Sequence, residues 1–270
     1  MLEITHLNKT FNPGTINEVR ALQDVNLKID PGSFVCVLGT NGSGKSTLLN
    51  AVAGTFLTDS GRITLNGRDI TRWPEHRRAS AIGRVFQNPF SGTAPSMSIA
   101  ENLALAARRG RKRGLSWMLK PSLVNDLKKR VKDLNMGLED RIDSAIGKLS
   151  GGQRQALTLL MSSWLKPDLL LLDEHTAALD PKTAGKVIEL TERIVTEGKL
   201  TTMMVTHSMQ QAVNLGDRII MMHQGSIRYD FGGEEKKRLK VPDLLALFDE
   251  LRRKDQIDNG VADLLIANYV

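Results

Sequence analysis

Alternating apolar and polar residues open the chain, and this period of two is typical of strands with one buried face. Two such runs cover residues 2–7 and 25–29, with a Pro-Gly loop at residues 12–14 between them. A third run covers residues 62–65, and the dipeptide Asn66-Gly67 that follows it favours a hairpin turn. The N-terminal part is therefore predicted to form antiparallel strands.

Further along, short and almost unbroken apolar runs predict strands that are buried on both faces, as in a parallel sheet. These runs are residues 34–38, 82–86, 169–172 and 202–206. Segments with helical periodicity lie between these runs, at residues 47–53 (ended by Gly54), 98–149, 150–164 and 183–197. Within 98–149 the pattern is clearest at 101–107 and 123–134. An amphipathic tail over 241–270 is also predicted to be helical. A last hairpin is predicted over 219–229, turning at Gln224-Gly225. The pattern predicts an α/β fold with a mostly parallel sheet, an N-terminal antiparallel β subdomain and an inserted α-helical subdomain at about residues 90–165.

Composition places the chain among ordinary folded domains. Its 270 residues can bury a sizeable core, with 41% hydrophobic and 25% charged residues. No stretch approaches the ~20 apolar residues of a membrane-spanning helix, and Met1 begins a strand-like pattern instead of a signal peptide. The single cysteine, Cys36, rules out an internal disulfide and is expected to fill the core. We therefore expect the chain to reside in the cytoplasm.

A modest positive charge is concentrated in one segment. The formal net charge is +7, from 37 Lys and Arg against 30 Asp and Glu, and residues 108–113 hold five of the positive charges, with Trp117 nearby. Such a run is usually a solvated face. The alternative is contact with an anionic membrane surface or an acidic partner.

A glycine-rich turn follows the apolar run 34–38 and is the strongest chemical signal in the chain. It reads Gly39, Thr40, Asn41, Gly42, Ser43, Gly44, Lys45, Ser46, Thr47, and we call it the phosphate loop. Between a strand and a helix, such a turn presents backbone N–H groups to phosphate oxygens. Lys45 is expected to reach the β- and γ-phosphates of a nucleotide, and the Ser46 hydroxyl to ligate Mg²⁺. The motif indicates a P-loop NTPase core.

Polar residues also follow the other buried runs. They are Gln87, the pair Asp173 and Glu174, and His207. Ligands bind beyond the carboxyl ends of the strands in open parallel sheets, so these side chains are expected around one nucleotide. Asp173 is placed to hold the Mg²⁺ shell, and Glu174 to act as general base for water. A helix cap plus a surface glutamate is the alternative for the two acids.

A second anion-binding turn carries a family resemblance. The sequence Leu149-Ser150-Gly151-Gly152-Gln153 is identical to the signature of ATP-binding cassette (ABC) proteins, and the match in motif order runs to about Phe231. The resemblance implies an ABC ATPase domain over residues 1–232 and a helical extension over 233–270. It further implies that Gln87 is the Q-loop residue that senses Mg²⁺ and water, that His207 contacts the γ-phosphate, that Asp180 lies in the D-loop and that Phe11 stacks on adenine. His175 departs from the family's usual proline, which leaves the rigidity of the D-loop in question.

The resemblance also implies partners. In the family two cassettes meet head to tail, so Ser150, Gly151, Gly152 and Gln153 of one copy contact the ATP bound by the other. The chain is thus expected to form an ATP-dependent dimer with its own copy, and to bind separate transmembrane permease subunits near residues 88–99. A solute-binding protein is expected in the same system, and no nucleic acid.

The resulting expectation is an ATP-hydrolysing motor of an ABC transporter on the cytoplasmic face of the membrane, driving import of an amino-acid-like solute. Two alternatives stay open, a soluble ABC ATPase of the cluster-assembly type and an efflux or lipoprotein-release cassette, which the loop 12–19 also resembles. The motif residues themselves specify neither the substrate nor the direction of transport, because substrate choice belongs to the membrane partner.

Overall fold

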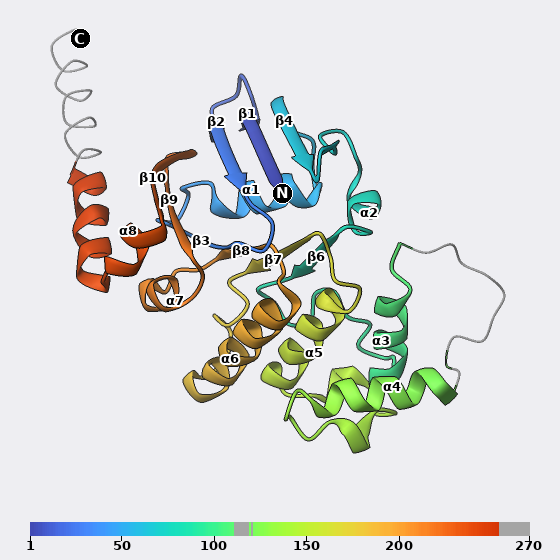
Figure 1. The fold of residues 1–270 in the computed structure, drawn as a ribbon. Helices are drawn as coiled ribbons and strands as arrows, with labels where there is room; N and C mark the ends of the chain where they lie inside the picture. The colour runs from blue at the N-terminus through green and yellow to red at the C-terminus, as the bar shows by residue number, and fades with distance from the viewer. Residues whose placement is uncertain (111–118, 120, 254–270) are drawn as a thin grey trace, which may run out of the picture.

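The protein is represented by a computed structural model that describes residues 1–110, 119 and 121–253 (Figure 1). Its strands are β1 (Leu2–Phe11), β2 (Val19–Ile29), β3 (Phe34–Gly39), β4 (Ser60–Leu65), β5 (Arg68–Asp69), β6 (Ile82–Val85), β7 (Leu169–Asp173), β8 (Thr202–Val205), β9 (Arg218–His223) and β10 (Ser226–Gly232). Its helices are α1 (Lys45–Ala53), α2 (Glu75–Arg78), α3 (Ile99–Ala107), α4 (Pro121–Lys132), α5 (Gly151–Ser163), α6 (Pro181–Gly198), α7 (Met209–Asn214) and α8 (Gly233–Arg238), with short 3-10 turns at Glu139–Arg141 and Ile146–Lys148. Residues 241–253 are also helical.

Two sheets organise the fold. The larger has the strand order β10-β9-β3-β8-β7-β6, and its pairs are parallel except for the β9–β10 hairpin. The smaller is antiparallel, with the order β2-β1-β4-β5. The predicted fold class is confirmed, because the unbroken apolar runs form the parallel sheet and the alternating runs form the antiparallel one.

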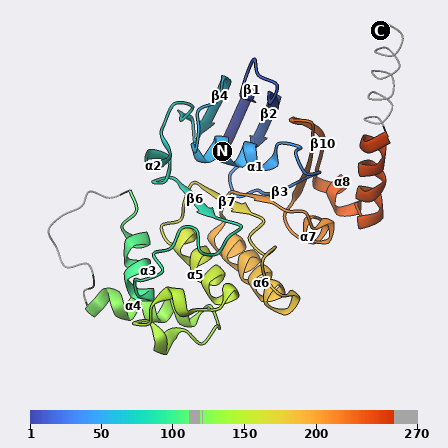
Figure 2. The same cartoon turned by 180° about the vertical axis from the view of Figure 1, so that it is seen from behind.

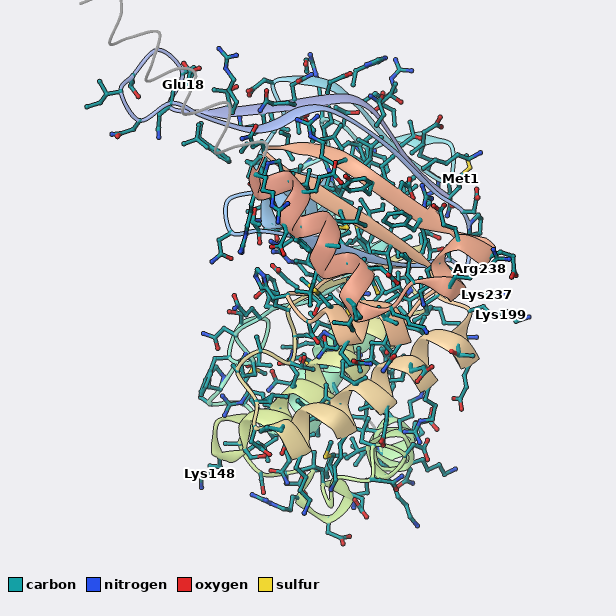
Figure 3. The ribbon with its side chains drawn as sticks, turned by 90° about the vertical axis from the view of Figure 1, so that its left-hand side faces the viewer. Met1, Glu18, Lys148, Lys199, Lys237 and Arg238 are labelled. Atoms are coloured by element: carbon teal, nitrogen blue, oxygen red, sulfur yellow. The ribbon has the colours of Figure 1, made fainter. Side chains whose placement is uncertain are left out.

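The elements stack in layers, with α1 between the two sheets and α5 and α6 beneath the larger one (Figures 1 and 2). One core cluster joins the antiparallel sheet, α1 and one face of the parallel sheet. A second cluster covers the opposite face with residues of α3 to α6. Seen from the side, Glu18 lies at the tip of the β1–β2 hairpin and Lys148 at the far end of the helical layer (Figure 3). The parallel sheet thus lies at the centre of the molecule, covered on both faces.

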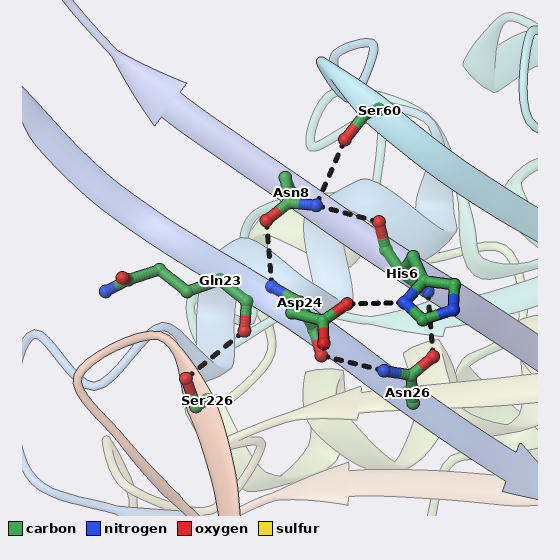
Figure 4. A network of polar contacts seen from close by, with 7 residues as sticks. All are labelled: His6, Asn8, Gln23, Asp24, Asn26, Ser60 and Ser226. Carbon is green, nitrogen blue, oxygen red and sulfur yellow. Dashed lines mark hydrogen bonds and ion pairs between the residues drawn. The ribbon is translucent and has the colours of Figure 1, made fainter.

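Irregular pairing bends the β1–β2 hairpin. His6 and Asp24 both have positive φ (50° and 49°), at a register shift in the ladder. The Asn8 amide donates to the His6 carbonyl (2.8 Å) and accepts from the Asp24 N–H (2.8 Å), while the Asn26 oxygen accepts from the His6 N–H (2.8 Å) (Figure 4). These asparagine side chains replace the ladder bonds that the bulge breaks.

A buried arginine caps the C-terminal end of α1. Arg78 is 1% exposed, and its guanidinium donates to the carbonyls of Ala51 (2.7 Å) and Val52 (2.9 Å) in α1 and to those of Trp73 (2.9 Å) and Thr71 (2.8 Å). Burial lowers the pKa of Arg78 to about 10. The last carbonyls of the helix that follows the phosphate loop are thereby satisfied.

We expect Arg78→Met to lower the free energy of unfolding by about 3 kcal/mol or more, because it removes four hydrogen bonds to backbone carbonyls, two of them buried. Urea denaturation measures this. The matched control is Arg77→Met, since Arg77 only stacks on the ring of Trp73 at 4.0 Å, and its loss should cost below about 1 kcal/mol. Equal effects of the two substitutions would contradict the capping role.

The lone cysteine behaves as expected. Cys36 is fully buried in β3, its Sγ donates to the Leu215 carbonyl at 3.6 Å, and burial raises the pKa of its thiol to about 12. Its predicted place in the core is confirmed.

Other sequence expectations differ from the structure or fall outside it. The helix predicted over 47–53 begins at Lys45, because Gly44 (φ 98°) is the last loop residue. The short helices α2, α7 and α8 were not predicted, since four to six residues are too few for a periodic pattern. Residues 111–113 of the basic segment, Trp117 and residues 254–270 of the tail lie outside the described residues. No helix in the described part of the chain is long and apolar enough to cross a membrane.

Candidate functional site

The carboxyl ends of β3, β6, β7 and β8 meet at one edge of the parallel sheet, and the polar residues that follow them converge there. Glu174 is at the centre of this group. Its Oε1 lies 2.7 Å from His207 Nε2, and its Oε2 accepts from Gln87 Nε2 at 3.2 Å. Glu174 itself has φ 44°, an unusual value for a non-glycine residue, so the turn after β7 holds its carboxylate in a constrained position.

The phosphate loop is shaped by its glycines. Gly42 and Gly44 have positive φ (78° and 98°), and a Cβ on Gly39 would lie 2.4 Å from Ser43 Oγ. Ser43 is 1% exposed, and its Oγ has no hydrogen-bond partner. A buried hydroxyl without a partner, inside a turn of backbone N–H groups, fits a site that binds an oxyanion.

Lys45 lies inside the loop. It is 5% exposed, and its Nζ donates to the carbonyls of Gly39 and Thr40, both at 2.9 Å. Burial lowers the pKa of Lys45, while Glu174 and Asp173 act in the opposite direction. The ammonium group is therefore held across the mouth of the loop, where it can neutralise phosphate charge.

Asp173 ends β7 beside an arginine that sequence reasoning missed. The Arg84 Nη2 lies 3.5 Å from Asp173 Oδ2 and donates to Asn50 Oδ1 on α1 at 2.6 Å. Burial raises the pKa of Asp173, and Arg84 and then Lys45 oppose that rise. Ser46 is exposed at the N-terminus of α1, one turn before Asn50.

This donor set suits a cation that is completed by nucleotide. No cluster of three or more His, Cys, Asp or Glu suited to a metal occurs among the described residues. Mg²⁺ typically takes one or two protein oxygens and completes its shell with phosphate oxygens and water. The Ser46 hydroxyl and the Asp173 carboxylate fit that pattern.

His175, the departure from the family's usual proline, is anchored inside the protein. It is 2% exposed, and its Nε2 lies 2.9 Å from Thr191 Oγ1 on α6, which itself donates to the Val187 carbonyl at 2.7 Å. Since that hydroxyl proton is engaged, the imidazole donates. Burial lowers the pKa of His175 to about 4, so the ring stays neutral at physiological pH. A buried hydrogen bond therefore tethers the segment after Glu174 to α6.

The Ser150–Gln153 turn forms the N-terminal cap of α5. Ser150 Oγ accepts from the Gln153 N–H, the Gln153 side chain accepts from the Ser150 N–H, and Gln153 also donates to the Met136 carbonyl. A Cβ on Gly152 would lie 1.9 Å from Thr183 Cγ2. None of the hydrogen bonds found in the described residues joins this turn to the phosphate loop of the same chain.

Two further predicted residues lie at separate points. The ring of Phe11, near the tip of the hairpin, packs edge-on against Phe56 with centroids 5.3 Å apart, and Lys9 Nζ lies 5.5 Å from the Phe11 centroid. Asp180 caps α6 by accepting from the Thr183 N–H at 3.1 Å.

A pocket of about 570 Å³ adjoins the phosphate loop and was not predicted. One wall contains Gly39, Thr40, Asn41 and His207, and the other is the helix over residues 241–253. That helix lines the pocket with Leu245, Phe248, Asp249 and Arg252, and buries Leu244, Phe248 and Leu251 in the core. The sequence shows the spacing of three and four residues between the apolar positions of this helix. It does not indicate which element those positions pack against.

The chain is similar in sequence to ATP-binding proteins of ABC transporters. The family model described as ABC transporter matches residues 22–177, more than half of the chain. A tyrosine transport ATP-binding protein of Clostridioides difficile (strain R20291) is 44% identical over 250 residues, which cover 92% of this chain and 99% of that protein. A methionine import ATP-binding protein of Corynebacterium jeikeium (strain K411) is 37% identical over 228 residues, which cover 82% of this chain and 58% of that protein.

Solved structures show the same fold. A dimeric ATP-binding cassette in a post-hydrolysis state, bound to ADP and phosphate, aligns with a TM-score of 0.74 and 27% identity over 86% of this chain and 98% of that one. A cassette in its ADP conformation aligns with a TM-score of 0.73 and 25% identity over 92% and 98% of the two chains.

Proposed function

The chain belongs to the ABC transporter family as an ATP-binding subunit with ATPase activity, and from this premise we propose that it powers import of an amino-acid-like solute. The observation that carries the proposal is the relative named for tyrosine transport, which is matched over 99% of its length. The methionine import relative supports the same solute class and direction.

ATP is bound, in this proposal, by the phosphate loop, with Lys45 on the β- and γ-phosphates and Phe11 against the adenine. The buried, unpartnered Ser43 hydroxyl and the held Lys45 ammonium support the phosphate assignment. Ser46, Asp173 and Gln87 would hold Mg²⁺. The ion, when bound, supplies positive charge to the transferring phosphoryl group.

Hydrolysis is assigned to the group around Glu174. Its carboxylate takes the proton from the attacking water, and His207 and Gln87, both within hydrogen-bond distance of it, fix its orientation. His207 also contacts the γ-phosphate, so the same imidazole reports whether that phosphate is present.

A second copy of the chain completes the site. Ser150, Gly151, Gly152 and Gln153 of one copy cap the ATP held by the phosphate loop of the other, with Asp180 near the junction. The dimeric cassette among the solved structures supports this arrangement.

The remaining partners follow from the transport role. Transmembrane permease subunits are proposed to bind near residues 88–99, with the subunit peripheral on the cytoplasmic face of the membrane and a solute-binding protein in the same system. Residues 1–232 are proposed as the ATPase domain, with the helical insertion at about 90–165, and residues 233–270 as an extension.

Purification from detergent-solubilised membranes tests this function. The chain should retain a polytopic membrane protein, and the complex in vesicles should take up tyrosine in an ATP-dependent manner. A complex rebuilt with Glu174→Gln is the matched control and should not sustain uptake. Recovery of the chain without any polytopic protein would instead favour the cluster-assembly type of ABC ATPase.

A further inference from the structure

One side chain bridges the two loops that carry Glu174 and His207. Gln211 lies on α7, and its Oε1 accepts from Thr206 Oγ1 at 2.8 Å while its Nε2 donates to Thr176 Oγ1 at 3.2 Å. Thr206 immediately precedes His207, and Thr176 follows Glu174 by two residues. A single amide therefore ties the end of β8 to the loop after β7.

Both anchor points are buried. Thr206 and Thr176 are only 4% and 7% exposed, and the Thr206 N–H donates to the Val37 carbonyl of β3. Thr206 Oγ1 also accepts from the Ser208 N–H at 3.1 Å, and the Gln211 N–H donates to Ser208 Oγ at 3.2 Å. The helix start thus holds the Gln211 backbone, and a shift of either loop would break a part-buried hydrogen bond of its side-chain amide.

We propose that Gln211 is a positioning residue for hydrolysis, which sets the contact between Glu174 and His207 by bridging Thr206 and Thr176. This inference rests on the roles proposed above for Glu174 and His207. Gln211 does not touch either of those side chains in the hydrogen bonds described, so it acts through the two loops. Because reaction rates fall by up to about 10²-fold for a displacement of ~1 Å, a loosened bridge should be visible in turnover.

The test substitution is Gln211→Met, which keeps the length of the side chain and removes both hydrogen bonds. We expect kcat for ATP to fall about tenfold while KM and the Kd for ATP stay within twofold, because the phosphate loop is untouched. Gln210→Met is the matched control, since the exposed Gln210 bonds only Asn214 within the same helix, at 3.1 Å. It should leave kcat within twofold of the wild type.

A double-mutant cycle separates positioning from a general structural role. In a His207→Ala background, followed by single-turnover kinetics, Gln211→Met should lower the rate less than twofold further. Thr176→Val removes only the hydrogen bond between Gln211 and Thr176, so alone it should lower kcat less than Gln211→Met does. Added to Gln211→Met, it should cause no further loss of kcat.

Three results would overturn the inference. These are a Gln211→Met kcat equal to that of Gln210→Met, a full tenfold loss that persists on top of His207→Ala, or a loss carried by KM. Each is distinct from failure of the roles proposed for Glu174 and His207, in which His207→Ala or Glu174→Gln alone would turn over ATP at the wild-type rate.

Discussion

Glu174→Gln is expected to reduce ATP turnover by ~10²–10⁴-fold while ATP binding survives. The amide keeps the shape of the side chain and can still contact His207 and Gln87, which lie 2.7 Å and 3.2 Å from the carboxylate oxygens. It cannot accept the proton of water. The substitution leaves Asp173, Ser46 and the phosphate loop unchanged. The Kd for ATP, measured by titration with a fluorescent ATP analogue, should therefore remain near the wild-type value.

The same variant should accumulate as a dimer when ATP and Mg²⁺ are present, because unhydrolysed ATP joins the phosphate loop of one copy to Ser150 of the other. Size-exclusion chromatography with and without ATP reads this directly. Adding Ser150→Arg should abolish the dimer, since the bulky side chain fills the second anion site at the start of α5. A double variant that still dimerises with ATP would contradict the composite site.

The second large effect is expected from Lys45→Ala, which should abolish tight ATP binding and turnover together. The substitution removes the charge proposed to meet the β- and γ-phosphates, and the carbonyls of Gly39 and Thr40 lose the ammonium that donates to them. Equilibrium binding of ATP and release of phosphate are the measurements. Lys28→Ala is the control, because the exposed Lys28 ammonium lies away from the phosphate loop, 3.9 Å from Asp30 Oδ1, and this variant should bind ATP normally. Near-normal hydrolysis by Lys45→Ala would remove the nucleotide-site assignment.

The site residues at the ends of buried strands could be predicted from the sequence. A parallel sheet brings the carboxyl ends of its strands to one edge, whatever connections join the strands. That rule places Gln87, Glu174 and His207 together without knowledge of any rotamer. The rule cannot place Arg78 or Arg84, because their contacts depend on how their side chains reach residues of other elements. Arg78 lies on a four-residue helix and bonds a carbonyl 27 positions earlier in the chain.

The role of Gln211 and the packing of the C-terminal helix could not be predicted, for a related reason. The helical pattern over 241–253 is visible as an amphipathic tail, but its register against the pocket beside Asn41 depends on packing of Phe248 and its neighbours. Gln211 gives no sequence signal, since an amide on a short helix is ordinary until its two partners are seen.

Cys36 makes this protein unusually convenient for spectroscopy. It is the single cysteine of the chain, and a fully buried thiol with a pKa of about 12 has almost no thiolate at neutral pH with which to attack a maleimide or a methanethiosulfonate. A cysteine introduced at exposed Glu18, at the tip of the β1–β2 hairpin, would therefore carry the only label in an otherwise native chain. Pairs of spin labels on two copies could then follow the cassettes as they close and open through the ATP cycle, without first replacing a native cysteine.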